Sequence, residues 1–280
     1  MLLPEIQTQL WESARNWQVT VQQVRETAGS LVAFGLRHDT PVVLKATSTE
    51  CDEADTGAVA AAFAGQGMVK VYEHARGSAL FERLQPGNAL SDLVFQGHDD
   101  EATGILAGVV SALHTGQRPV AGFRTAADWG MGFDWYVRSG DQQIPADRVQ
   151  KARAHYHQLC QTQKDVRLLH GDLQHYNVLY DRTRGWTAID PKGVVAELEF
   201  ELGAALRNPW HRPELYSSWP AVQRRVTILD QHLRIEMERV LGWAYAQSVL
   251  SAIWTVEDRM ALSPDNPSML LAQTLEPLLA

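Results

Sequence analysis

Cysteine, long apolar runs and excess positive charge are all scarce in this 280-residue sequence. The two cysteines, Cys51 and Cys160, have no CxxC spacing, which argues against a disulfide framework and a structural zinc site. There are 25 lysines and arginines against 33 acidic residues, so the formal net charge is −8. Because nucleic-acid phosphates are bound by cationic surfaces, we expect no nucleic acid polymer as a partner.

Signals for export and membrane insertion are also lacking. No run approaches the roughly 18 consecutive apolar residues that a membrane-spanning helix needs. The first residues, MLLPEIQTQLWESARNW, lack the basic start and apolar centre of a signal peptide. We therefore expect a cytoplasmic protein without a membrane partner, and the composition leaves its oligomeric state open.

The sequence otherwise has an ordinary globular composition, with 45% apolar and 21% charged residues. The first third is rich in strand patterns, which are found at 18–24, 30–36, 41–47, 68–75 and 78–84. An Ala-rich segment at 52–67 predicts one helix among them. After a Pro-Gly turn at residues 86 and 87, helical spacing dominates, at 99–116, 125–137, 145–160, 196–206, 219–242, 243–260 and 268–280. We predict two lobes, 1–86 and 87–280.

Residues 168–193, LLHGDLQHYNVLYDRTRGWTAIDPKG, carry many polar groups beside two apolar runs. Asp172 and Asn177 are five residues apart, and Asp190 follows thirteen residues later, after the second run. The pattern predicts a β-hairpin that brings Asn177 and Asp190 to the same end of two paired strands. Asp181 falls at the hairpin tip, as a turn residue.

These three side chains suit phosphoryl transfer from a nucleotide. That reaction needs a carboxylate to orient and deprotonate the attacking hydroxyl, and oxygen ligands for Mg²⁺. An isolated aspartate near a turn is more often a helix cap or a solvated group. Three such residues at these spacings, with Lys45 on an upstream strand, favour the catalytic interpretation.

The stretch HGDLQHYNVLY…AIDPKG resembles the catalytic and metal-binding loops of the protein-kinase-like phosphotransferases. Gly171 replaces the arginine of HRD and Pro191 replaces the phenylalanine of DFG, as is typical of aminoglycoside phosphotransferases. With GQGMVKVYEH, VVAELEFELGAAL and RNP, nearly the whole chain is similar to the streptomycin kinase and hydroxyurea phosphotransferase family. The resemblance implies an α+β, two-lobed protein-kinase-like fold. Its small β-rich N-lobe, with about five strands and one helix, binds the nucleotide, and its larger, mainly helical C-lobe carries the catalytic and substrate sites.

The resemblance implies roles for the catalytic stretch, residue by residue. Asp172 matches the catalytic base, whereas Asn177 and Asp190 match the Mg²⁺ ligands. His170 matches the loop histidine, whose role is more structural than chemical. The sequence departs from the family pattern at Gln174, where histidine is usual, and this change affects how the loop is held rather than its chemistry.

The resemblance also implies a site for ATP (or GTP). Lys45 matches the strand lysine that holds the α- and β-phosphates, and Glu53 matches its helix glutamate partner, with Asp55 as the alternative. The turn from Thr27 to Ser30 would cover the phosphates. The remaining nucleotide-binding residues that it implies are Ser30, Glu82, Leu84 and Lys192.

Those residues have distinct expected contacts. Backbone groups near Glu82 and Leu84 would meet the adenine, and Lys192 would neutralise phosphate charge. Glu197 would line the acceptor side. Three tryptophans, Trp129, Trp135 and Trp210, could stack on an acceptor ring, although core packing is the commoner role.

The implied function is transfer of the γ-phosphate to a hydroxyl of a small molecule, an aminoglycoside such as streptomycin or a related hydroxylated compound. The acidic balance is compatible with a cationic acceptor. One alternative is a metabolic kinase that acts on a sugar or amino alcohol. Another is a non-catalytic nucleotide-binding protein of the same fold, which is disfavoured because no member of the catalytic set is missing.

Overall fold

The computed structural model describes residues 3–27, 29–116, 120–139 and 142–279. The chain divides into two compact units. The first unit combines Met1–Ala89 with Asn177–Lys192, and the second combines Leu90–Tyr176 with Gly193–Ala280. The predicted hairpin therefore groups with the N-terminal strands. The functional lobes that we assigned to 1–86 and 87–280 stay a prediction.

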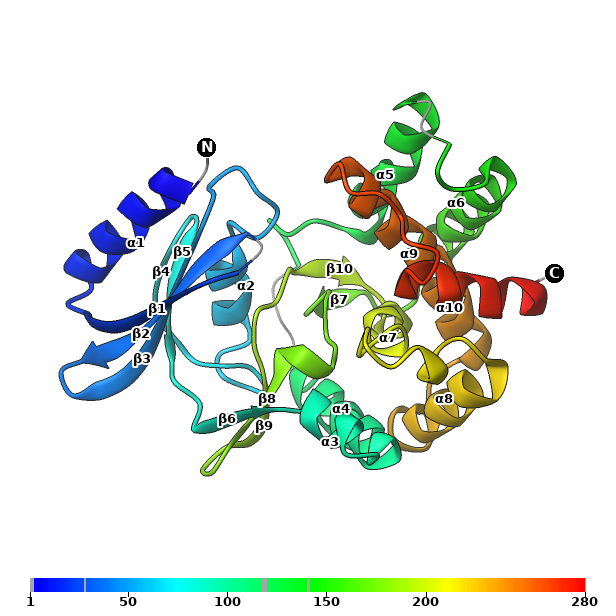
Figure 1. Ribbon diagram of the computed structural model, residues 1–280. Helices are drawn as coiled ribbons and strands as arrows, with labels where there is room; N and C mark the ends of the chain where they lie inside the picture. The colour runs from blue at the N-terminus through cyan, green and yellow to red at the C-terminus, as the bar shows by residue number, and fades with distance from the viewer. Residues whose placement is uncertain (1–2, 28, 117–119, 140–141, 280) are drawn as a thin grey trace. The chain divides into compact units, whose positions relative to one another are not determined.

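A five-stranded antiparallel sheet with the order β1-β2-β3-β5-β4 forms the centre of the first unit (Figure 1). Its strands are β1 (Thr20–Glu26), β2 (Ser30–Arg37), β3 (Thr40–Thr47), β4 (Val71–Ala75) and β5 (Ser78–Glu82). All five correspond to strands predicted from the sequence. The strand β4 begins later than predicted because Met68 and Val69 pair with Ala188 instead.

Two helices, rather than the single one predicted, pack on this sheet. The helix α1 (Leu3–Asn16) lies along β2 and β3, where Ile6, Leu10 and Ala14 enter the core at helical spacing (Figure 1). The helix α2 (Thr56–Ala62) is shorter than the predicted 52–67 segment. Residues 51–55 form bends and turns, so Glu53 precedes the helix instead of lying in it.

The pleat of β3 decides where Lys45 points. Val42, Leu44 and Ala46 face the core under α1, so Lys45 faces the opposite side of the sheet. On that side α2 packs closely on β5, because a Cβ added to Gly57 would lie 2.8 Å from the Cβ of Ala79. Ala79 pairs directly with Lys45.

The predicted hairpin is present as β8 (Val178–Asp181) and β9 (Gly185–Ala188). Its pairing is in register from Val178 with Ala188 to Asp181 with Gly185. A third strand, β6 (Pro86–Ala89), joins the other side of β8. The sequence did not predict β6, because its Pro-Gly pair reads as a turn.

The second unit is mainly helical. Its helices are α3 (Ser91–Phe95), α4 (Asp99–Leu113), α5 (Ala126–Ser139), α6 (Ala146–Gln161), α7 (Leu198–Leu206), α8 (Trp219–Leu233), α9 (Met237–Glu257) and α10 (Pro267–Leu275). The largely buried α9 packs against α5, α6, α7 and α10 (Figure 1). The strands β7 (Arg167–Leu169) and β10 (Val194–Ala196) form a short antiparallel pair. Within the described ranges, no helix has the length and apolar content that crossing a bilayer requires.

One predicted helix, 219–242, is wrong in its extent. The helix α8 stops at Leu233 because Arg234 takes a left-handed conformation, with φ of 53°. The next helix then runs from Met237 through Trp243, across the predicted boundary. Helical spacing alone does not reveal such a break, since apolar residues continue on both sides of it.

Candidate active site

Lys45 is buried in the first unit and pairs with two partly exposed carboxylates. Its Nζ is 2.8 Å from Glu53 Oε2 and 2.5 Å from Asp190 Oδ1. Burial lowers the pKa of Lys45, but the carboxylates of Asp190 and Glu53 outweigh it and raise the pKa above its usual value. Asp55 instead pairs with Arg76 at 2.7 Å, so the structure selects Glu53 as the partner of Lys45.

The hairpin places Asn177 and Asp190 at one end of β8 and β9. The N–H of Ile189 donates to the carbonyl oxygen of Asn177 at 2.9 Å, one residue beyond the last strand pair. Asp190 then takes a left-handed conformation, with φ of 60°, which aspartate tolerates better than most residues. One carboxylate and one amide oxygen fit Mg²⁺, which takes its other ligands from phosphates and water. Among the described residues no group of three or more His, Cys, Asp or Glu side chains could hold a metal ion by itself.

Glu201 of α7 binds the backbone of the loop that carries Asp172. The Glu201 carboxylate accepts hydrogen bonds from the N–H groups of His170 (2.7 Å) and Gly171 (2.9 Å). The N–H of Asp172 donates to Nδ1 of His170 at 3.2 Å. Burial raises the pKa of Glu201 to about 7, against the effect of the backbone donors. Glu201 was given no role in the site from the sequence.

The departure at Gln174 has a local structural effect. Its Oε1 accepts a hydrogen bond from the N–H of Tyr176 at 2.8 Å, within the short 3₁₀ turn His175–Asn177. Burial, together with Arg225, lowers the pKa of His175 to about 3, so this imidazole is neutral. Gln174 therefore closes the turn that leads into Asn177.

Arg207, just after α7, is the second residue that sequence reasoning missed. Burial lowers the pKa of its guanidinium, whereas the nearby carboxylate of Asp172 raises it. Among the described residues, Nη1 of Arg207 has no hydrogen-bond partner. A partly buried cation thus lies within electrostatic range of the proposed base. Its only sequence signal was the tripeptide RNP.

A cavity of about 440 Å³ opens in the second unit between α5 and α9. Besides two arginines, its polar and aromatic lining consists of Asp128, Trp129, Asp134, Trp135, Trp254 and Glu257. Trp129 packs edge-on against Trp254, with ring centroids 5.4 Å apart. A Cβ added to Gly171 would lie 3.1 Å from Cη2 of Trp129. One wall of the cavity therefore contacts the loop directly beside Asp172.

Comparison with known proteins identifies the family. The family described as aminoglycoside/hydroxyurea antibiotic resistance kinase matches residues 16–259. The chain belongs to this family. A streptomycin 6-kinase of Streptomyces griseus is 32% identical over 252 residues, which cover 86% of this chain and 80% of the relative. A hydroxyurea phosphotransferase of Kitasatospora aureofaciens is 29% identical over 80% of this chain and 67% of its own length.

A solved structure of similar fold is that of the aminoglycoside phosphotransferase APH(4)-Ia, in a ternary complex with ADP and hygromycin B. Its TM-score is 0.64 at 12% identity, with 96% of this chain and 97% of that chain covered. The kinase therefore has the two-lobed protein-kinase-like fold, as the sequence predicted. It is a phosphotransferase with an alcohol group as acceptor, which was also predicted.

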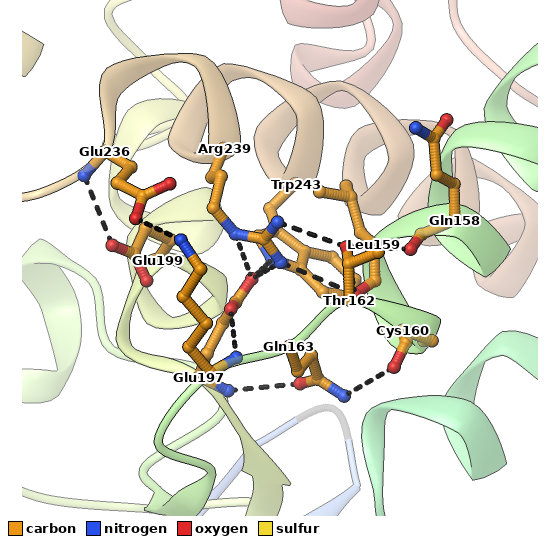
Figure 2. Close-up of polar contacts among 11 residues, drawn as sticks. Gln158, Leu159, Cys160, Thr162, Gln163, Glu197, Glu199, Glu236, Arg239 and Trp243 are labelled. Atoms are coloured by element: carbon orange, nitrogen blue, oxygen red, sulfur yellow. Dashed lines mark hydrogen bonds and ion pairs between the residues drawn. The ribbon is translucent and has the colours of Figure 1, made fainter.

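Glu197 was expected to line the acceptor side, but its side chain is buried in the kinase. Figure 2 shows Glu197 in a dense polar network, and only 1% of its surface is exposed. Its Oε1 accepts hydrogen bonds from Arg239 Nε (2.8 Å) and Trp243 Nε1 (2.6 Å), and its Oε2 accepts one from the N–H of Lys164 (3.0 Å). The expectation for Glu197 was wrong, because its carboxylate accepts hydrogen bonds both from α9 and from the segment after α6.

The other predicted nucleotide contacts of the kinase have clear positions. Ser30 Oγ and Thr27 Oγ1 are 2.7 Å apart, and the N–H of Thr27 donates to the Ser30 carbonyl at 2.9 Å. Ala28, between them, lies outside the described residues. Leu84 is buried, whereas Lys192 is half-buried and directly precedes the return of the chain to the second unit. Their contacts to a nucleotide stay predictions.

Proposed function

We propose that this kinase transfers the γ-phosphate of ATP (or GTP) to a hydroxyl of a small cationic molecule, an aminoglycoside such as streptomycin. Asp172 would orient the attacking hydroxyl and accept its proton. Most of the rate gain would come from positioning and charge stabilisation. The proposal rests on family membership together with the arrangement of the charged groups within each unit.

The nucleotide end follows from the cluster around Lys45. Its raised pKa keeps Lys45 cationic, which suits a contact with the α- and β-phosphates, and Glu53 fixes its direction. Asn177 and Asp190 would hold Mg²⁺, which neutralises phosphate charge when bound. Arg207 places a cation near Asp172, and the carboxylate of Asp172 in turn raises the pKa of the Arg207 guanidinium.

The acceptor end is the cavity between α5 and α9. Tryptophan faces attract ammonium and guanidinium groups, and carboxylates pair with them. The observation that carries this assignment is the contact between Trp129 and Gly171, because it joins the cavity wall to the neighbour of Asp172. An acceptor in this cavity would lie beside the proposed base.

The function is tested by measuring ATP consumption in Mg²⁺ with a panel of acceptors. The panel holds streptomycin, other aminoglycosides, hydroxyurea, choline and simple sugars, and each assay is repeated with Asp172→Ala. We expect an aminoglycoside to raise turnover far above the variant. Turnover only with choline or a sugar would favour the metabolic kinase. No acceptor-dependent turnover, with nucleotide binding intact, would favour a non-catalytic protein.

The acceptor cavity makes a separate prediction for Trp135, which is 41% exposed. Trp135→Ala should raise the KM for the acceptor roughly tenfold, because a cation–π contact contributes about 1–2 kcal/mol. The KM for ATP should not change. Trp11→Ala is the matched control, since Trp11 is 54% exposed on α1 and lies outside this cavity. Equal acceptor KM values in the two variants would remove the cavity from the proposal.

A further inference from the structure

The tip of the β8–β9 hairpin is bound to the linker between β5 and β6, which comprises residues 83–85. The N–H of Gln85 donates to Oδ2 of Asp181 at 2.8 Å. In return, the N–H of Arg182 donates to the carbonyl oxygen of Gln85 at 2.9 Å. Both backbone groups of Gln85 are therefore fixed by the hairpin.

Arg184, from the same tip, holds the start of this linker. Its Nη1 forms an ion pair with Glu82, the last residue of β5, and Nη2 donates to the carbonyl oxygens of Met68 (3.0 Å) and Gly65. Glu82 also accepts a hydrogen bond from the N–H of Lys70 at 2.7 Å. The Arg184 and Glu82 side chains are only 19% and 16% exposed, so water competes little for this pair.

Asp181 is itself held in place. It accepts hydrogen bonds from Thr183 Oγ1 (2.6 Å), from the N–H of Thr183 (2.8 Å) and from the N–H of Arg184 (3.1 Å). These bonds, with the one from Gln85, keep the pKa of Asp181 well below its usual value. The residue does more than complete a turn, because it is a fixed anion that binds the linker.

The opposite end of the same hairpin carries Asn177 and Asp190. Four-residue strands, paired without a bulge, separate this end from the tip. At about 3.3 Å per residue, the separation is roughly 13 Å. A short paired hairpin that is also bound to β6 is a stiff spacer.

We propose that Asp181 and Arg184, here called the linker clamp, are positioning residues for the nucleotide. The linker would contact the purine, and Asn177 and Asp190 would hold the Mg²⁺ that binds the phosphates. The clamp keeps the linker at a fixed distance from Asn177 and Asp190. The clamp therefore affects the affinity for a nucleotide that reaches both the linker and the metal ligands. It does not contact the phosphates. This inference rests on the proposed function, since it assumes that the linker and the hairpin bind one nucleotide.

The test compares Arg184→Met with Arg182→Met. Arg182 is exposed at the same tip and contacts the linker through its backbone, so it is a matched control. Binding of Mg²⁺–ADP and of Mg²⁺–tripolyphosphate is measured by calorimetry. We expect Arg184→Met to lower the affinity for Mg²⁺–ADP about tenfold. The affinity for Mg²⁺–tripolyphosphate should not change, because Lys45, Asn177 and Asp190 are intact. The affinity of Arg184→Lys for Mg²⁺–ADP should lie between those of Arg184→Met and the wild type.

Other outcomes separate the alternatives. Asp181→Asn keeps the side-chain volume, so it replaces Arg184→Met if the latter fails to fold, with the same expected loss of ADP affinity. Equal ADP affinity in the wild type, Asp181→Asn and the Arg184 variants would overturn the clamp alone. Parallel losses of ADP and tripolyphosphate would also overturn it, in favour of a general structural role. A wild-type protein that binds neither ligand would instead overturn the proposed function.

Discussion

Asp172→Asn should lower kcat by about 10²- to 10⁴-fold, the usual contribution of a positioned general base. The amide has the shape of the carboxylate but does not accept the proton of the acceptor hydroxyl. Nucleotide binding should persist, because Lys45 and the hairpin belong to the other unit. Steady-state kinetics at saturating ATP and acceptor measure the loss of turnover. The stabilisation of the variant by Mg²⁺–ADP shows that its nucleotide site is intact.

The control for this variant is Asp165→Asn. Asp165 is exposed upstream of the loop and has a φ of 47°, a conformation that asparagine also adopts readily. It should retain full activity. If Asp172→Asn kept more than about a tenth of the wild-type kcat, the role of general base would have to be given up.

Asp190→Asn should lower kcat by about 10²-fold or more and shift the Mg²⁺ dependence to higher concentration. The substitution removes the single carboxylate in the proposed metal site and one of the two anions that pair with Lys45. Metal coordination contributes several kcal/mol of charge stabilisation in the transition state, and each 1.36 kcal/mol is a factor of ten in rate. A titration of kcat against free Mg²⁺ measures both effects.

Asp55→Asn is the matched control for Asp190. Asp55 was the alternative partner of Lys45, but it pairs with the exposed Arg76, so its loss should leave kcat and the Mg²⁺ titration unchanged. A surface pair of this kind contributes little to stability. Superimposable Mg²⁺ titrations for the two variants would exclude Asp190 as a ligand.

Much of the fold was predictable because its signals are local. Short strand-like runs bounded by turn residues marked the five strands of the first sheet, and the turn between the apolar runs marked the β8–β9 hairpin. The errors arose where neighbours in space decide the structure. The strand β4 begins late because Met68 and Val69 pair with Ala188, which is far away in the sequence. The helix α8 ends because Arg234 takes a left-handed backbone conformation, which the spacing of apolar residues does not record.

The sequence by itself determined the family, because the resemblance rests on motifs that run along nearly the whole chain. It also placed Asn177 and Asp190 at one end of a hairpin, because the spacing of residues along two short paired strands fixes which of them share an end. Only the tertiary structure decided the partners of the site residues. It selected Glu53 over Asp55 as the partner of Lys45 and placed the Glu201 carboxylate against the N–H groups of His170 and Gly171. It also turned Asp181 and Arg184 from tip residues into contacts of the linker. Glu82 and Arg184 are 102 residues apart in the chain, and a contact over that separation exists only once the chain has folded.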